Sequence, residues 1–280
     1  MTDSQVGTTA HDVYYRLRKI AREEDRPFHD LLVRYGMERL LYRLGQSQHS
    51  GKFALKGGLM LLVWGTPTRR YTMDVDLLGH FPNSVEAVVE VIRDACEQEV
   101  EDDGFVFDPS STRGEEMNPD KEYPGVRVHL LAYLGKAKVP LKIEMGFGDV
   151  VVPGEEWADY PTILGFGAPR IKAYPKECFV AEKLEAMVKL GEANTRMKDF
   201  YDLWLLPREY AFDGKVLAEA VGRTFENRRT AVRADPACFT STFGGNKQRD
   251  WAADERQSEL PASDTQNCRS RGGERSVSCR

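Results

Sequence analysis

The sequence predicts an α+β fold in which β-strands lie between helical regions at the two ends of the chain. Two observations predict it. Apolar residues recur at helical spacing within the first fifty residues and again after residue 175, whereas the stretches between them alternate or are short and β-branched. A length of 280 residues suits one or two domains. We expect N-terminal helices over 1–50, a core over 51–165, a C-terminal helical region over 166–230 and a disordered tail over 231–280.

Two helices are expected in the N-terminal region. Residues 12–24 and 30–44 each carry apolar side chains three or four positions apart, which is typical of an amphipathic helix. Pro27 separates the two because a proline interrupts a helix. The polar residues 45–51 then indicate a loop. The chain is therefore expected to open with a helical pair.

The core region carries the patterns of strands. A strand over 53–56 is expected to end at Gly57-Gly58, and residues 59–64 are expected to form a short buried helix. Residues 71–78 alternate, so their apolar side chains face one way and their polar side chains the other. The remaining elements expected here are a helix over 84–99, an exposed acidic loop over 97–122 with a short strand at 105–107, two strands over 126–134 and 138–145, and a short strand at 150–152.

Three further helices are expected after a Pro- and Gly-rich link over 153–175. Each carries an apolar stripe, and they span 176–190, 197–206 and 217–225. Beyond residue 228 this pattern ends, and residues 244–280 are rich in Gly, Ser, Gln, Asn and Arg. So few large apolar side chains cannot offset the entropy lost on ordering, which predicts a disordered tail. Our hypothesis for its origin is a frame-shifted or unstructured terminus.

Composition excludes several classes of protein. The net charge of −5 excludes a polybasic coat of the histone kind, although a local basic groove for nucleic acid is compatible with it. No apolar run approaches the roughly 18 residues of a membrane span, and the first residues lack the pattern of a secretory signal. The five cysteines show no zinc-binding spacing. We therefore expect a cytoplasmic protein with reduced thiols and no membrane partner.

Carboxylates on the expected strands form the most informative pattern. Asp74 and Asp76 are two positions apart on a strand, so their side chains project from the same face and can converge on a divalent cation. Glu144 lies between apolar neighbours on a later strand and also faces away from the core. It can complete a metal-binding triad or accept the proton of an attacking hydroxyl group.

The glycine pair Gly57-Gly58 complements these acids. Without Cβ atoms, its backbone allows a ligand to approach closely, and N–H groups at a helix start attract phosphate. In isolation, two acids on a strand are more often a solvent-exposed face, and two glycines are more often a turn. Their order is more specific: a strand, two glycines, a helix, a strand with two acids and a later strand with one acid.

This order resembles the DNA polymerase β-like nucleotidyltransferase superfamily. More narrowly, the sequence is similar to the AbiEii/AbiGii toxin family, which includes the MenT nucleotidyltransferase toxins. The similarity covers residues 50–230 and implies a mixed sheet between the helical regions. Four stretches carry it: Leu55-Lys-Gly-Gly-Leu-Met60, Arg70-x-Thr72-x-Asp74-x-Asp76-Leu77, Ala181-Glu-Lys183-Leu-Glu-Ala186 and Arg196-x-Lys198-Asp199-Phe-Tyr-Asp202-Leu203.

The resemblance also implies roles for individual residues. Asp74 and Asp76 would hold Mg²⁺, and Glu144 stands where the superfamily has its third acid, which is Asp in many relatives. Lys183 would face the triphosphate, and Asp199 would belong to the same catalytic site. From the residues alone, Lys183 either snorkels to solvent or points into a cleft. The nucleotide-binding residues would be Lys56, Gly57, Gly58, Arg70, Thr72, Lys183 and Asp202.

The activity implied by the resemblance is Mg²⁺-dependent transfer of a nucleoside monophosphate from an NTP, with the 3′ end of tRNA as the expected acceptor. The family further implies a toxin with a cognate antitoxin, often an AbiEi-like winged-helix protein. Two alternatives stay open. The acceptor could be a small molecule or a protein side chain, or the chain could be an inactive, damaged toxin that acts as a binding module. A tRNA acceptor predicts a basic groove beside the two aspartates.

Overall fold

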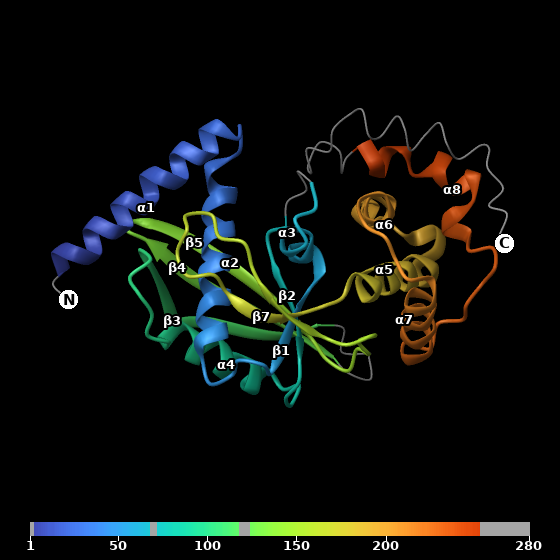
Figure 1. Cartoon of the computed structure of the whole chain (residues 1–280), viewed down its shortest axis with the longest axis horizontal. Coiled ribbons are helices and arrows are strands. Elements are labelled where there is room, and N and C mark those ends of the chain that lie inside the picture. Colours follow the sequence, from blue (N-terminus) through green and yellow to red (C-terminus); the bar gives the residue numbers. More distant parts are fainter. Residues whose placement is uncertain (1–2, 68–71, 118–123, 253–280) are drawn as a thin grey trace. The chain divides into compact units, whose positions relative to one another are not determined.

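The computed structural model describes residues 3–67, 72–117 and 124–252, with side chains from residue 9 onwards (Figure 1). Arg70 and the part of the expected tail over 253–280 lie outside the described residues. The chain divides into two compact units. Unit 1 comprises residues 1–65, 72–149 and 155–174, and unit 2 comprises residues 66–71, 150–154 and 175–280.

Within the described residues, unit 1 is built on a seven-stranded mixed sheet with the order β3-β4-β5-β2-β1-β7-β6. β2 lies in the middle, antiparallel to β1 and parallel to β5, so both of its edges are hydrogen-bonded. The strands are β1 (Phe53–Lys56), β2 (Val75–Gly79), β3 (Phe105–Met117), β4 (Gly125–Leu134), β5 (Ala137–Gly146), β6 (Glu156–Asp159) and β7 (Arg170–Ala173). The helices are α1 (Asp3–Glu23), α2 (Phe28–Gln46), the 3-10 turn η1 (Gly57–Leu59), α3 (Met60–Val63) and α4 (Val85–Glu97).

Helices α2 and α4 pack on one face of this sheet (Figure 1). A Cβ atom at Gly36 of α2 would lie 3.2 Å from the side chain of Leu141, and one at Gly114 of β3 would meet Val85 and Val89 of α4. Alternate residues of β2 and β5 are buried on this covered face, namely Val75, Leu77, Leu141, Ile143 and Met145. The polar residues between them lie on the opposite face, as the alternation predicts.

A buried group of charged residues holds α2 within unit 1. Arg39 and Arg43 donate hydrogen bonds of 2.7 and 2.6 Å to Asp103, and all three side chains are buried. The neighbouring Glu38 accepts a hydrogen bond from the backbone N–H of Ile163. Burial outweighs this hydrogen bond and raises the pKa of Glu38 to about 7. Unit 1 therefore contains a buried carboxyl group that titrates near neutral pH.

Two parts of the sheet correct the sequence-based expectation. Residues 105–117 form one long strand, β3, where the sequence predicts an exposed loop with a short strand. The register between β3 and β4 shifts between Asp108 and Arg113, and this irregularity accommodates Pro109 within the strand. The expected link also contains β6 and β7, which are too short for periodicity to reveal. Residues 150–152 form no strand.

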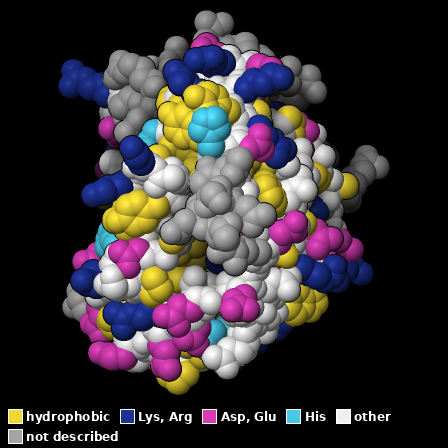
Figure 2. Space-filling model, turned by 90° about the vertical axis from the view of Figure 1, so that its left-hand side faces the viewer, with side chains coloured by type: hydrophobic (Ala, Val, Ile, Leu, Met, Phe, Trp, Pro, Cys, Tyr) yellow, Lys and Arg dark blue, Asp and Glu magenta, His cyan; other side chains and the backbone are white. Residues whose placement is uncertain are grey.

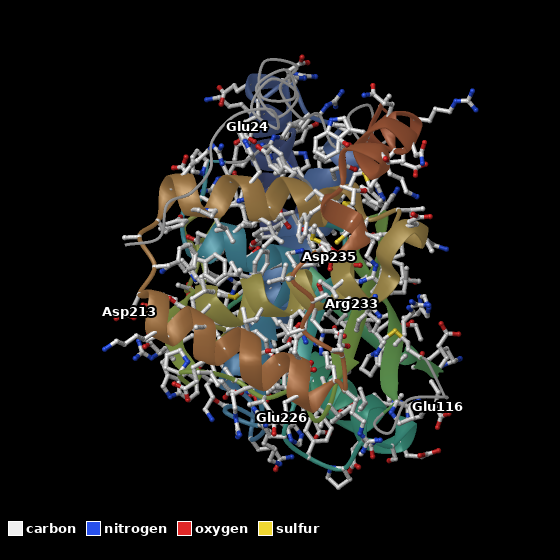
Figure 3. The ribbon with its side chains drawn as sticks, turned by 90° about the vertical axis from the view of Figure 1, so that its right-hand side faces the viewer. Glu24, Glu116, Asp213, Glu226, Arg233 and Asp235 are labelled. Carbon is white, nitrogen blue, oxygen red and sulfur yellow. The ribbon has the colours of Figure 1, made fainter. Side chains whose placement is uncertain are left out.

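Unit 2 is helical in its described residues. The predicted helices of this region are confirmed. Asp213 caps α7 by accepting hydrogen bonds from the backbone N–H groups of Lys215 and Val216, and Glu226 lies near the other end (Figure 3). The helices are α5 (Lys176–Leu190), η2 (Gly191–Ala193), α6 (Met197–Glu209), α7 (Gly214–Asn227), η3 (Ala237–Phe239) and α8 (Ser241–Asn246).

The segment before residue 253 is more ordered than its composition predicts. Cys238 and Phe243 are buried in one cluster with Met187 and Met197, and Trp251 packs against this cluster. A few widely spaced apolar side chains suffice because α5 and α6 supply the rest of the core. This finding corrects the predicted start of the tail, because helices η3 and α8 lie within it.

Two further features concern the helices and the charges on the surface. No helix in the described part of the chain is long and apolar enough to cross a membrane. On the face shown in Figure 2, basic and acidic side chains are interspersed.

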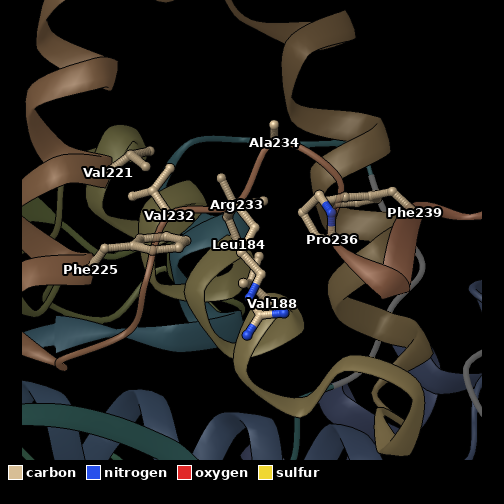
Figure 4. A pocket seen from close by; sticks show the side chains of 9 residues that line it. All are labelled: Leu184, Val188, Val221, Phe225, Val232, Arg233, Ala234, Pro236 and Phe239. Carbon is tan, nitrogen blue, oxygen red and sulfur yellow. The ribbon is translucent and has the colours of Figure 1, made fainter.

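Unit 2 has an open hollow of about 270 Å³ into which Arg233 contributes a guanidinium group (Figure 4). Its other lining residues are Leu184, Val188, Val221, Phe225, Val232, Ala234, Pro236 and Phe239.

Candidate functional site

Five charged residues stand in register across the sheet of unit 1. They are Lys56, Asp76, Glu144, Arg127 and Glu115, and each is the register partner of the next on the neighbouring strand. Register partners project from the same face of a sheet. These five residues, which we name the charged row, therefore cross β1, β2, β5, β4 and β3 on the face opposite α2 and α4. The centre of the row carries two adjacent carboxylates, Asp76 and Glu144.

A lysine joins Asp74 to the charged row. Asp74 directly precedes β2, and Lys142 lies two positions before Glu144 on β5. The Nζ atom of Lys142 lies 2.9 Å from Oδ2 of Asp74 and 3.2 Å from Oε1 of Glu144. Burial alone would lower the pKa of Lys142, but the two carboxylates outweigh it and raise that pKa. The ammonium group is therefore charged at neutral pH.

Arg127 neutralises Glu144 from the other side. Its Nε and Nη2 atoms lie 3.1 and 3.0 Å from Oε1 of Glu144, and its Nη1 atom lies 3.2 Å from Oε1 of Glu115. The hydrogen bonds and charge of Glu144, followed by those of Glu115, raise the pKa of Arg127. Glu144 thus contacts two protein cations, Arg127 and Lys142.

The two glycines lie directly against this face. Gly57 has a φ angle of +67°, a conformation that residues with a Cβ atom rarely adopt. A Cβ atom there would lie 2.7 Å from Cγ of Asp76. At Gly58 a Cβ atom would lie 3.2 Å from Cβ of Thr72. The turn η1 therefore brings the backbone against Asp76 and Thr72, and a larger residue would displace one of them.

Lys56 at the end of β1 already has a partner in this structure. Its Nζ atom lies 2.6 Å from Oδ2 of Asp149 and 5.1 Å from the centre of the Tyr174 ring. The two charged side chains are 15% and 17% exposed, so the pair is mostly buried. Asp149 therefore neutralises the charge of Lys56, a residue that the resemblance expects to bind a nucleotide.

A second candidate cluster lies within unit 2, on α5 and α6. The Nζ atom of Lys183 lies 3.0 Å from Oδ2 of Asp202 and forms a further ion pair with Asp199. It also lies 4.6 Å from the centre of the Phe179 ring. Asp202 is fully buried and the side chain of Lys183 is 13% exposed. The lysine therefore points between the two helices and does not snorkel to solvent.

The described residues of the predicted site fall into two groups, one within unit 1 and one within unit 2. Arg70 lies outside the described residues. Sequence reasoning missed Lys142, Arg127 and Asp149, although the alternation over 138–145 already placed Lys142 on the face of Glu144. Unit 1 holds Lys56, Gly57, Gly58, Thr72, Asp74, Asp76 and Glu144, and unit 2 holds Lys183, Asp199 and Asp202.

The acids fit a divalent cation in their chemistry. Within the described residues, no group of three or more His, Cys, Asp or Glu side chains could hold a metal ion by itself. Asp74 and Glu144 nevertheless hold a cation between them, the ammonium group of Lys142. Mg²⁺ commonly binds through one or two carboxylates together with substrate phosphates. Asp74 and Asp76 therefore fit a metal that binds together with a phosphate ligand.

Comparison with known protein families places the chain among the nucleotidyltransferases. The model of the family described as "Nucleotidyl transferase AbiEii toxin, Type IV TA system" matches residues 39–268. The chain therefore belongs to the AbiEii family of nucleotidyltransferase toxins, whose members are part of type IV toxin–antitoxin systems. No curated protein matches the chain.

Two solved structures resemble the chain at low sequence identity. One, from H. pylori, is described as a "putative nucleotidyltransferase"; it shares 17% identity, covers 83% of each chain and has a TM-score of 0.47. The other is JHP933 from Helicobacter pylori, with 17% identity, 82% of this chain and 93% of that chain covered, and a TM-score of 0.41. The family assignment rests on the match to the family model alone.

Proposed function

We propose that this toxin transfers a nucleoside monophosphate from an NTP to the 3′ end of tRNA in a Mg²⁺-dependent reaction. The observation that carries the proposal is the register of the charged row, which sets Asp76 beside Glu144. Lys142 joins Asp74 to the same group, and Gly57 brings the backbone of η1 against Asp76. Metal-assisted phosphoryl transfer requires carboxylates that hold a cation and backbone groups that bind a phosphate.

Asp74 and Asp76 would hold Mg²⁺ in this reaction, while Gly57 and Gly58 would receive the phosphates. When bound between these acids and the phosphates, Mg²⁺ would neutralise charge on the phosphate oxygens and on the leaving pyrophosphate. The acceptor hydroxyl oxygen would form a bond to the α-phosphorus and release its proton to solvent water. The bond from the α-phosphorus to the bridging oxygen breaks, and pyrophosphate leaves.

Glu144 receives a different role from the one first expected. Its Oε1 atom contacts both Lys142 and Arg127, so its charge is already engaged by protein cations. We assign it to holding these two cations beside Asp74 and Asp76. A role for Glu144 as third metal ligand requires that it exchange a protein cation for the metal.

Lys183, Asp199 and Asp202 are assigned to the same reaction on the order of the four family motifs. Lys183 would neutralise charge on the triphosphate. Its ammonium group is paired with two acids, which hold it in one orientation. Asp199 and Asp202 would position it. Lys56, Arg70 and Thr72 stay proposed nucleotide-binding residues.

The partners follow from the family and from the substrates. A type IV toxin–antitoxin family implies a cognate antitoxin, which we propose to be an AbiEi-like winged-helix protein. NTPs and tRNA occur together in the cytoplasm, so we propose that the toxin acts there.

The decisive experiment incubates the full chain with Mg²⁺, total tRNA and each α-³²P-labelled NTP. We expect label on tRNA from at least one NTP, and its loss in the variant D74A/D76A and in the variant K183M. The variant D159N is the matched control, since Asp159 is an exposed acid of the same sheet, on β6. Thermal melting of each variant separates lost chemistry from lost fold.

The alternatives give different results in the same assay. Label that appears on added protein or on a small acceptor, but not on tRNA, replaces the proposed acceptor and keeps the chemistry. A folded chain that binds an NTP but labels no acceptor supports a binding module. Label on tRNA that persists in D74A/D76A refutes the assignment of these acids.

A further inference from the structure

We propose that Lys142 is a tethered counter-ion that keeps divalent cations from Asp74 until a nucleotide supplies further ligands. The inference rests on the proposed function, because it takes Asp74 and Asp76 as the acids that hold the metal. It makes Lys142 a positioning residue, which acts on the metal site and not on the reacting atoms.

The backbone of β5 places this lysine. Lys142 and Glu144 are two positions apart on one strand, so both project from the same face. The parallel pairing of β5 with β2 sets Glu144 opposite Asp76 and brings Lys142 within 2.9 Å of Asp74. One ammonium group therefore joins acids from two neighbouring segments of the sheet.

The charges around the site explain why a counter-ion is needed. Asp76 and Glu144 lie side by side on adjacent strands and Asp74 directly precedes β2, so like charges gather there and repel one another. Arg127 contacts Glu144 but shares its guanidinium group with Glu115. Among the described residues, the cation that contacts Asp74 is Lys142. Within the described part of the chain, Lys142 therefore compensates the charge of Asp74.

The same contact creates a competition. A divalent cation and the ammonium group of Lys142 seek the same oxygen of Asp74. Because the lysine is tethered, its effective concentration is fixed and high, and a free metal ion must displace it. The side chain is 36% exposed and flexible, so it can leave Asp74 without movement of β5. A metal that arrives with a triphosphate brings phosphate ligands, which offset the cost of this displacement.

Binding of Mn²⁺ to the full chain without nucleotide tests the proposal, because Mn²⁺ takes oxygen ligands and its binding is visible by electron paramagnetic resonance without turnover. We expect K142M to bind Mn²⁺ about tenfold more tightly than the wild type, since one competing charge is removed from the site. K142Q is a second neutral variant should K142M melt at a lower temperature. K142R keeps the charge and should match the wild type.

The variant K138M is the matched control, because Lys138 is an exposed lysine on the same face of β5. We expect it to bind Mn²⁺ as the wild type does. Adding a non-hydrolysable NTP analogue should tighten Mn²⁺ binding to the wild type, because the phosphates supply further ligands to the metal. If the analogue leaves Mn²⁺ binding to the wild type unchanged, the dependence on nucleotide is refuted.

Two negative results have different meanings. If D74N/D76N abolishes Mn²⁺ binding but K142M and K142Q bind no more tightly than the wild type, the role of Lys142 is refuted and the proposed function stands. If Mn²⁺ binding to K142M is the same with and without the D74N/D76N substitutions, the acids hold no metal. The proposed function then fails in its metal site, and the role of Lys142 fails with it.

Discussion

Asp76 lies so close to Gly57 that position 57 has no room for a side chain. The φ angle of Gly57 is +67°, and a Cβ atom there would lie 2.7 Å from Cγ of Asp76. Lys56, the residue before this glycine, is also the register partner of Asp76. The strand β1 therefore delivers its turn against a carboxylate of the neighbouring strand, so the two family motifs depend on each other sterically.

Substitution of Gly57 by alanine should abolish nucleotide transfer and lower the free energy of unfolding. The positive φ angle costs about 1–2 kcal/mol for a residue with a Cβ atom, and the contact with Asp76 adds to it. The variant G65A is a matched control, because Gly65 has a φ angle of +66° but no atom within 4 Å of an added Cβ. Chemical denaturation and the tRNA-labelling assay should show a larger stability loss in G57A than in G65A, and lost transfer in G57A alone. Equal losses would show that the contact with Asp76 has no cost.

Substitution of Gly58 by alanine should be partly rescued by a second substitution at Thr72. The backbone of Gly58 does not have a positive φ angle, so its constraint is the contact with Thr72. We expect G58A to lower the free energy of unfolding by about 1–2 kcal/mol, as overpacking commonly does. In G58A/T72A the hydroxyl and methyl groups are gone, and a double-mutant cycle should give a coupling of at least about 0.5 kcal/mol. Additive losses would contradict the contact.

The stability of the protein should fall as pH rises from about 4.5 to 7 through the titration of Glu38. Burial raises the pKa of this acid from 4.5 to about 7, so the folded state binds a proton that the unfolded state has released. The contribution amounts to at most about 3 kcal/mol, since one pKa unit corresponds to roughly 1.4 kcal/mol. The charged and titratable groups around Glu38 are Arg34, Arg39, Tyr35 and Tyr160.

The variant E38Q isolates this titration. Urea unfolding at pH 5, 6, 7 and 8 should show that E38Q gains stability relative to the wild type as pH rises. The difference should level off above pH 8, where Glu38 is ionised in both states. A difference that is constant from pH 5 to 8 would mean that the pKa of Glu38 is not raised.

Truncation of Phe243 should destabilise unit 2 although the residue lies in a segment of low apolar content. Phe243 is 6% exposed and packs with Met187, Met197 and Cys238. F243A should lower the free energy of unfolding by about 2–4 kcal/mol, the usual cost of a large-to-small change in a core. V232A should change it by less than about 0.5 kcal/mol, because Val232 is 72% exposed. If both variants have the same stability, residues 237–252 do not belong to the folded core.

The alternation of strands predicted which face each acid occupies, because that periodicity is local. The expected positions of Asp76 and Glu144 opposite the covered face are confirmed. Their side-by-side register could not be predicted, since β2 and β5 are separated by more than fifty residues and pair in parallel. Arg127 was missed for the same reason, because its partners Glu144 and Glu115 lie on other strands. The contact of Lys142 with Asp74 also depends on this pairing, although Glu144 lies on the same strand as Lys142.

Composition was the weaker guide at the C-terminal end. The segment around Cys238 and Phe243 has few large apolar side chains, so no helical period reveals its helices. The burial of these two residues depends on Met187 and Met197, which lie earlier in the chain. In β3 the irregularity near Asp108 hid a long strand behind a proline and several polar residues. In both segments tertiary packing overrides the local pattern.

The pairing of β5 with β2 also governs which folded molecules persist. A slip by one residue would set Ile143 or Met145 opposite Asp76 and turn Glu144 toward α2 and α4. Lys142 would turn with Glu144, and burying these two charged side chains there, away from Asp74, would be costly, so the slipped chain would be unstable. Degradation of misfolded copies would therefore also remove the copies in which Glu144 does not lie beside Asp76.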